Sequence, residues 1–258
     1  MHHIRTQSLD SIGMPEWPWN QFMDIIINSL SEFRLKSCSI PNDFIQKEAL
    51  FGSKANLHQV KTVTWACQTE KIRKARAVCV DAGKSASVLN FVIVPLNCYD
   101  LPFFGADFVT LPSGHLLALD LQPALKNDIS HTAKVWEELI PIHHKWQSLL
   151  PSGGSIPLEA KPFFSPGFLW SRVPLGKEGE VLIKNVLMQA FRDYISLYIR
   201  LINKASRVSK ERSLEILSGQ KLYMNYRANK DPARGMLGRF YGHDWTEKYI
   251  NNVLFDLE

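Results

Sequence analysis

The chain has 258 residues, of which 45% are hydrophobic and 21% are charged, so it can bury a sizeable core. Its net charge of +5 is too small to indicate a nucleic-acid-binding protein, because such proteins carry clustered basic residues and a recognition module. No apolar run approaches the roughly 20 residues that span a membrane, and residues 1–11 lack the apolar core of a signal peptide. We therefore expect no nucleic-acid partner and no membrane partner.

Motifs for a resident cofactor are absent from the sequence. Its cysteines form no C-x-x-C pair, and its histidines form no H-E-x-x-H motif, so no metal site is expected. A glycine-rich phosphate loop is also missing, which argues against a bound nucleotide or flavin. We expect no bound cofactor, no metal, and reduced cysteines.

In chain order, the first predicted element is a helix within 17–35, where apolar residues recur at helical spacing. Residues 36–58 are expected to be irregular. Strand-like segments follow at 61–69, 71–80 and 88–95, and two further strands, around Asp107 and Asp120, are joined by the turn PSGH. Connections this short favour hairpins and an antiparallel sheet.

The second half of the chain is mainly helical in its periodicity. Residues 131–150 predict a helix bent or broken at Pro141, 151–167 a surface connection, and 168–173 a last strand. An amphipathic helix is predicted over 177–205, and Ser209 is a suitable N-cap for another helix reaching about 229. We predict one α+β domain over 1–258, in which a central antiparallel sheet is flanked by helices on both faces.

Three polar side chains interrupt segments that are otherwise built for burial. Asn90 lies within VLNFVIVP, and an amide there is either a hydrogen-bonded core residue or faces a ligand cavity. Asp107 follows a glycine and an alanine, which leave room for a ligand or for close backbone packing. Burial would raise its pKa, as a proton donor near neutral pH requires. Asp120 is more typical of a strand-end turn.

Two further stretches carry unusual charge. The segment YRANKDPARGMLGRFYGHDW (226–245) places an acid among several arginines, which suits either an ion-pair network or a site for an anionic ligand. The strand at 71–80 carries Lys71, Arg73, Lys74 and Arg76, a pattern typical of a solvated edge strand. An alternative is a docking face for an acidic protein.

These segments carry a resemblance to the ferredoxin-dependent bilin reductases. The matching pieces are KIRKARAVCVDAG, VLNFVIVP, YDLPFFGADFVTLPSGHLLALDLQP, FFSPGFLWSR and YRANKDPARGMLGRFYGHDWTEKYINNVLFD, in the order and spacing of the family. The resemblance covers most of the chain from about residue 60 onwards.

The resemblance implies an α/β/α sandwich that holds an open-chain tetrapyrrole between the sheet and the C-terminal helices. It implies that no cofactor is bound, that electrons come singly from reduced ferredoxin, a small acidic [2Fe–2S] protein, and that the protein supplies protons to bilin radicals. It further implies a monomer in a cytoplasm of cyanobacterial type or in a plastid stroma. The reductase that forms dihydrobiliverdin is a further expected partner.

Within this resemblance, Asp107 in FGADFV matches the acid on the sheet side of the bilin, and Asp231 in KDPAR matches the acid from the helical side. Arg227 stands four residues before Asp231, and Asn90 occupies a position that is His in the phycocyanobilin-forming branch. Further candidates for holding the substrate are three residues of adjoining segments: Arg172, which suits a propionate because its guanidinium is bidentate, with Arg234 and Ser113 as weaker choices.

The chain most resembles the branch that reduces the A-ring diene of 15,16-dihydrobiliverdin to phycoerythrobilin. The phycocyanobilin-forming branch has a Glu where this chain has apolar residues near Val78, which argues against reduction of the D-ring vinyl group. Two alternatives stay open. The enzyme takes biliverdin through both two-electron steps, or the chain is a bilin carrier that has lost reduction.

Overall fold

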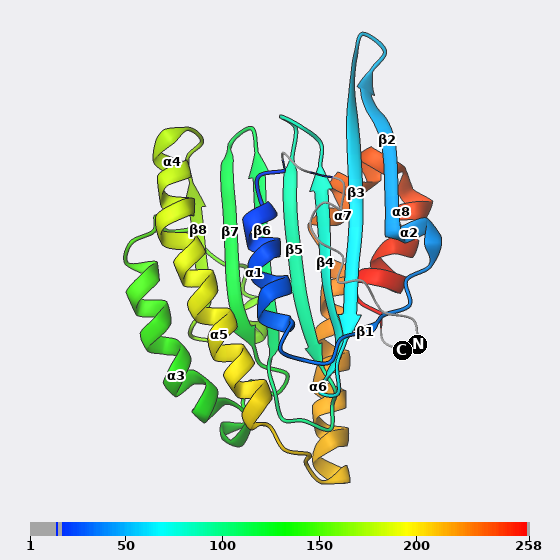
Figure 1. Cartoon of the computed structure of the whole chain (residues 1–258). Helices are drawn as coiled ribbons and strands as arrows, with labels where there is room; N and C mark the ends of the chain where they lie inside the picture. Colours follow the sequence, from blue (N-terminus) through cyan, green and yellow to red (C-terminus); the bar gives the residue numbers. More distant parts are fainter. Residues whose placement is uncertain (1–13, 15–16, 257–258) are drawn as a thin grey trace.

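A computed structural model describes Met14 and residues 17–256 of the chain, so the prediction about residues 1–11 lies outside the described residues. One antiparallel sheet runs through its centre (Figure 1). Its strands are β1 (Lys36–Ser37), β2 (Gln46–Ser53), β3 (Asn56–Gln68), β4 (Ile72–Asp81), β5 (Ser87–Pro95), β6 (Phe103–Leu111), β7 (Gly114–Gln122) and β8 (Leu169–Val173). They follow the order β1-β3-β4-β5-β6-β7-β8, and β2 pairs with β3.

Helices cover both faces of this sheet, which confirms the α/β/α arrangement (Figure 1). One face carries α1 (Asn20–Leu30), α3 (Ile129–Gln147) and α5 (Met188–Lys204), the last preceded by α4 (Lys177–Leu182) and a π-helical turn (Ile183–Leu187). The other carries α6 (Lys210–Lys230), α7 (Ala233–Tyr241), α8 (His243–Tyr249) and a second π-helical turn (Ile250–Leu254). Two short pieces complete the described chain: α2 (Asn42–Ile45) and a 3-10 turn (Lys161–Phe163).

Strand alternation divides the core into two layers. In β5, Leu89, Phe91 and Ile93 are buried against the face that carries α1 and α5, hereafter the closed face. Val88 and Val92 belong to the opposite layer, hereafter the open face. Because successive side chains of a strand point to opposite sides, a strand that is apolar throughout must lie inside the sheet, as predicted for this one.

The structure corrects two local predictions. Residues 36–58 are not irregular, because β2 and the start of β3 form a hairpin there. Most side chains of this hairpin are exposed, so it lacks the hydrophobic alternation that identifies a strand. Helix α3 is continuous through Pro141, so the predicted break is wrong and the alternative of a bend stays a prediction. The predicted N-cap Ser209 is confirmed, since its hydroxyl accepts a hydrogen bond from the Arg212 amide at 3.2 Å.

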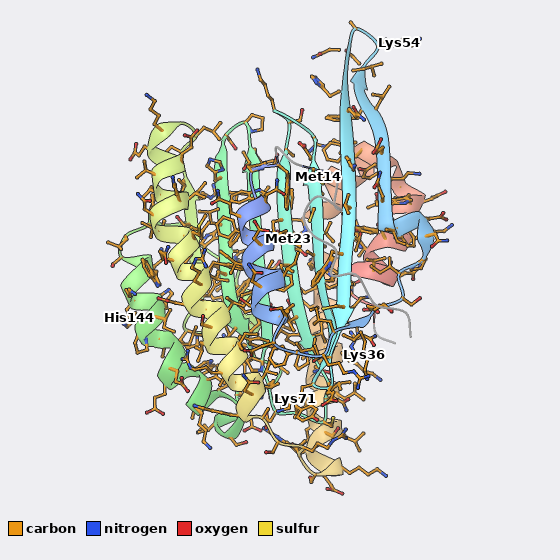
Figure 2. All side chains as sticks on the ribbon, in the orientation of Figure 1. Met14, Met23, Lys36, Lys54, Lys71 and His144 are labelled. Carbon is orange, nitrogen blue, oxygen red and sulfur yellow. The ribbon has the colours of Figure 1, made fainter. Side chains whose placement is uncertain are left out.

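The basic strand at 71–80 is not an edge strand, which corrects a third prediction. It is β4, which lies between β3 and β5, and both Lys74 and Arg76 are buried. Lys74 Nζ lies 2.9 Å from a carboxylate oxygen of Asp256 and 3.3 Å from the Val253 carbonyl. Lys71 lies near the end of α5 (Figure 2) and donates to the Ile202 carbonyl at 2.8 Å. These cations therefore fasten other segments to the sheet.

Within the described part of the chain, no helix is both long enough and apolar enough to cross a membrane.

Candidate functional site

A large cavity lies on the open face, between the sheet and the C-terminal helices. Its volume is about 1120 Å³, at the upper end of ordinary small-molecule sites, which run to about 1,000 Å³. Strands β4 to β7 supply its floor and α7 supplies much of its roof. Most of the lining is apolar, so the polar groups that enter it are few and deliberately placed.

Strand register places the sheet-side acid. Asn90 of β5 pairs with Asp107 of β6, and a continuous row across the sheet runs through residues of six strands: Thr64, Val78, Asn90, Asp107, Ala118 and Trp170. From β4 to β8, each member of this row lines the large cavity. The row puts small or apolar side chains on both sides of the Asn90–Asp107 pair, which leaves room above the carboxylate.

Asp107 is held by hydrogen bonds within the sheet. The Asn90 amide nitrogen donates to a carboxylate oxygen of Asp107 at 3.2 Å, and Arg76 Nη1 donates to the Asn90 carbonyl oxygen at 2.7 Å. Burial raises the pKa of Asp107, while the Arg227 charge and the Asn90 hydrogen bond oppose that rise. A carboxyl group in this setting holds its proton more tightly than an exposed aspartate does.

Asp231 faces the cavity from the helical side. Helix α6 ends before Asp231, whose backbone is extended, as expected of a residue that precedes proline. Its carboxylate accepts a hydrogen bond at 2.7 Å from the Ala233 amide at the start of α7. The sequence D-P-A thus ends one helix, begins the next, and places a buried acid in the lining of the large cavity.

A smaller hollow of about 340 Å³ adjoins the large one and shares Asn90, Asp107 and Trp170 with it. Arg227 of α6 lines this hollow, and its Nε atom is buried without a hydrogen-bond partner among the described residues. Electrostatic attraction links Arg227 to both acids of the site, Asp107 and Asp231. Asp107 therefore lies where the two hollows meet, with the half-buried guanidinium of Arg227 beside it.

Asp120 also lines the smaller hollow, and it lies within β7, not in a turn at its end as the sequence suggested. It is 1% exposed and accepts hydrogen bonds from the Ser165 hydroxyl and, at 2.9 Å, from the Ser165 amide. Burial raises its pKa to about 7, against the lowering effect of Ser165. These bonds fasten the 151–167 connection to β7, so that segment, which runs over the surface as predicted, also helps to enclose the hollow.

The structure brings some of the candidate residues to the site and leaves others outside. Ser113, in the turn between β6 and β7, lines the large cavity. Arg172 of β8 is exposed and packs over the Trp170 ring, 5.9 Å from its centre, without lining either hollow. Arg234 is also absent from both linings, because Arg234 Nε forms an ion pair with Glu247 at 2.6 Å.

Two basic residues of this region were not assigned individual roles from the sequence, although Arg239 lies in the segment 226–245 that suggested a site for an anionic ligand. Arg239 of α7 lines the large cavity and is exposed at its mouth. Gly235, Met236, Arg239 and Phe240 line it together, and the spacing of these residues along the helix was the available signal. Arg76 gave no such signal, because its partner Asn90 lies on the neighbouring strand.

Comparisons with known proteins point to one family. The family model described as ferredoxin-dependent bilin reductase matches residues 23–256. The chain is 61% identical over 257 residues to the phycoerythrobilin:ferredoxin oxidoreductase of Prochlorococcus marinus (strain MIT 9211), which covers 100% of both chains. It is 56% identical to the protein of the same name from Synechococcus sp. (strain RCC307), covering 98% of this chain and 97% of that one.

The fold is shared with a solved structure. The crystal structure of tomato phytochromobilin synthase in complex with biliverdin matches with a TM-score of 0.82, covering 93% of this chain and 83% of that chain. Sequence identity in this match is 23%, so it supports the α/β/α arrangement of sheet and helices.

Proposed function

Because this chain belongs to the ferredoxin-dependent bilin reductase family and is a ferredoxin-dependent oxidoreductase, we propose that it reduces the A-ring diene of 15,16-dihydrobiliverdin to phycoerythrobilin. The reaction adds two electrons, delivered singly by reduced ferredoxin, and two protons, supplied by the protein. The observation that carries the proposal is the pair Asp107 and Asp231, which line one large apolar cavity from its sheet side and its helical side.

Electrons and protons alternate in this proposal. An electron added to a bilin in an apolar cavity creates a negative charge that is poorly solvated, so a proton must follow before the second electron enters. The net charge of +5 favours encounter with an acidic ferredoxin through long-range attraction. The bilin radical that exists between the two electrons is the expected intermediate.

The two acids take different roles. Asp231 is the principal proton donor to the A-ring side, while Asp107 protonates the pyrrole system or stabilises the protonated radical. The reverse assignment is distinguishable, because each single variant would then stall at the other stage. Asn90 and Arg227 contact the bilin near Asp107, where the two hollows meet.

The propionate groups of the bilin bind at the cavity mouth. Ser113 offers a hydroxyl there, and Arg239 offers a guanidinium that can bind a carboxylate through two hydrogen bonds. Arg172 lies outside the lining and contributes by long-range attraction only. We assign no substrate contact to Arg234, because Glu247 already neutralises its charge.

The choice of double bond rests on the apolar neighbourhood of Asn90. Val78 pairs with Asn90 in the sheet, so the position beside this amide offers no acid for reduction of the D-ring vinyl group. The names of the cyanobacterial relatives support the same product. The protein would therefore receive dihydrobiliverdin from a reductase that has already saturated the C15–C16 bond.

An anaerobic assay with reduced ferredoxin tests this proposal. Biliverdin and 15,16-dihydrobiliverdin are offered separately, and products are identified by absorbance and chromatography. Turnover of dihydrobiliverdin alone, to phycoerythrobilin, is the expected result. Turnover of biliverdin would instead indicate a four-electron reductase, and tight binding of both bilins without turnover would indicate a carrier.

A further inference from the structure

Arg76 is a buried cation whose place in the fold calls for an explanation. It is 1% exposed on β4, and no carboxylate of the described residues forms an ion pair with it. Burying an unpaired charge strongly destabilises a fold. Its Nε atom donates to the Leu254 carbonyl at 3.2 Å, and its guanidinium lies 5.8 Å from the centre of the Phe255 ring. Attachment of the C-terminal segment is therefore one role, but Lys74 already serves it.

The remaining contact of Arg76 is with Asn90 of the site. Arg76 Nη1 lies 2.7 Å from the side-chain oxygen of Asn90. A guanidinium has only donors, so the Asn90 atom that meets it must be the acceptor, the carbonyl oxygen. The amide nitrogen of Asn90 must then point the other way, and it lies 3.2 Å from Asp107. Without Arg76, a half-turn of the amide would present its oxygen to Asp107 instead.

We propose that Arg76 is a positioning residue that fixes the Asn90 amide with its nitrogen toward Asp107. Asn90 is thereby restricted to donating a hydrogen bond to the carboxylate, which it stabilises in its charged form. Arg76 does not touch the cavity, so it acts on the site only through Asn90 and through its own charge. This inference deepens the proposed function and rests on it, because it concerns an acid to which that function assigns a proton.

The consequence is a defined change in the proton affinity of Asp107. The groups that face Asp107 are Arg76 on β4, Asn90 on β5, Arg227 on α6 and Asp231 after α6. Burial and Asp231 raise the pKa of Asp107, whereas Arg227, Asn90 and Arg76 lower it. Release of the Asn90 amide removes one lowering influence, so the pKa of Asp107 rises and the proton is held more tightly.

An infrared titration of the ligand-free protein measures this directly. The carboxyl band of Asp107 is identified by its loss in Asp107→Asn and followed with pH in wild type, Arg76→Met, Asn90→Ala and the double variant. We expect Arg76→Met and Asn90→Ala each to raise the titration midpoint by about one pH unit, a tenfold gain in proton affinity. The double variant should show no more than the larger single shift.

Lys74→Met is the matched control, because Lys74 lies on the same strand and holds the same C-terminal segment without contacting Asn90. Its midpoint should equal that of wild type. An equal shift in Lys74→Met, additive shifts in the double variant, or an unchanged midpoint in Arg76→Met would each overturn the proposal. If Arg76→Met does not fold, Arg76→Gln replaces it, since a glutamine amide can present either of its polar atoms and fixes nothing.

The titration needs no turnover, so it separates this inference from the proposed function. The expected shifts in a protein that reduces neither bilin would leave the role of Arg76 standing and overturn the enzymatic assignment. Normal reduction of dihydrobiliverdin without any shift of the titration midpoint would support the enzymatic assignment and overturn the role of Arg76.

Discussion

The two faces of the sheet are built from the same strands, but the closed face packs against helices and the open face carries the site. In β6, Phe104 and Phe108 point to the closed face, where both rings pack against Phe191 of α5 at 5.7 to 5.8 Å between ring centres. Gly105 and Asp107, which alternate with them, point to the open face and line its hollows. One stretch of six residues, FFGADF, therefore supplies both packing and site.

The difference shows how a site with costly groups is supported. The open face contains the buried Arg76, the buried acids Asp120 and Asp231, and a cavity of about 1120 Å³, all of which reduce stability. The closed face contains aromatic rings packed at normal distances, for example Phe22 and Phe108 at 4.9 Å. Dense packing on one side thus holds the strands, and with them the acids, in fixed register.

The largest expected effect is on the open face and concerns turnover. Asp107→Asn and Asp231→Asn should retain bilin binding but lower the reduction rate by about 10²–10⁴-fold, the usual contribution of a positioned acid. Anaerobic single-turnover absorbance should show a persistent radical. Asp193→Asn is the matched control, because Asp193 lies on α5 at the closed side and is bonded to Trp146. Wild-type rates in both acid variants would remove the proton-donor assignment.

The next effect is on the closed face and concerns stability. Phe108→Ala should lower the free energy of unfolding by about 3–5 kcal/mol, because Phe108 is fully buried and leaves a void. Val109→Ala, on the next residue but facing the large cavity, should cost much less, since space already lies beside it. Urea unfolding of the two variants compares the faces. Equal losses would contradict the distinction between them.

A smaller effect depends on pH and on Asp120. Its pKa is raised to about 7 in the folded protein, while in the unfolded chain it lies near about 4. The folded state therefore binds the proton more tightly than the unfolded chain does. The free energy of unfolding consequently falls as pH rises from about 4 to about 7. Relative to wild type, Asp120→Asn should gain about 1.4 kcal/mol per pH unit across that window and remain constant above it. Urea unfolding at several pH values measures this gain, and a constant difference would show that Asp120 does not titrate there.

The smallest expected effect is on bilin binding, and it compares a residue at the mouth of the cavity with a residue outside the lining. Arg239→Ala should weaken binding of 15,16-dihydrobiliverdin about tenfold, the value of one hydrogen bond to a charged group. Arg172→Ala should change it by less than about threefold, because Arg172 lies outside the lining and its charge is screened by water. Fluorescence titration of the two variants measures both constants. A larger loss of affinity in the Arg172 variant would show that Arg172, and not Arg239, binds the propionate.

The interior of the fold was predictable from the sequence, and its periphery was not. Strands β4 to β7 alternate or are apolar throughout, so their burial leaves a pattern in the residues themselves. The β2–β3 hairpin has exposed side chains, including Leu50 and Leu57, and leaves none. Lys54 at its tip is far from the sheet centre in Figure 2, where no packing constrains the residue type.

The site was predictable in part. Asp107 and Asp231 follow from a resemblance that spans most of the chain, whereas spacing alone left each of them open. Arg76 was misjudged because a run of basic residues is typical of an edge, and only the pairing of β4 with both neighbours reveals its burial. Its contact with Leu254 joins residues 178 positions apart, which no local pattern contains.

The two layers of the core also differ in when their residues leave the ribosome. The buried members of the closed-face layer run from Met14 to Ile202, whereas the open-face layer needs residues as late as Phe255. Chains are made from the N-terminus at about 5–20 residues per second, so the aromatic layer can assemble while the roof of the cavity is still being synthesised. The sheet then serves as a template on which the later helices close, and a tetrapyrrole can be enclosed only after the segment that ends at Phe255 has been made.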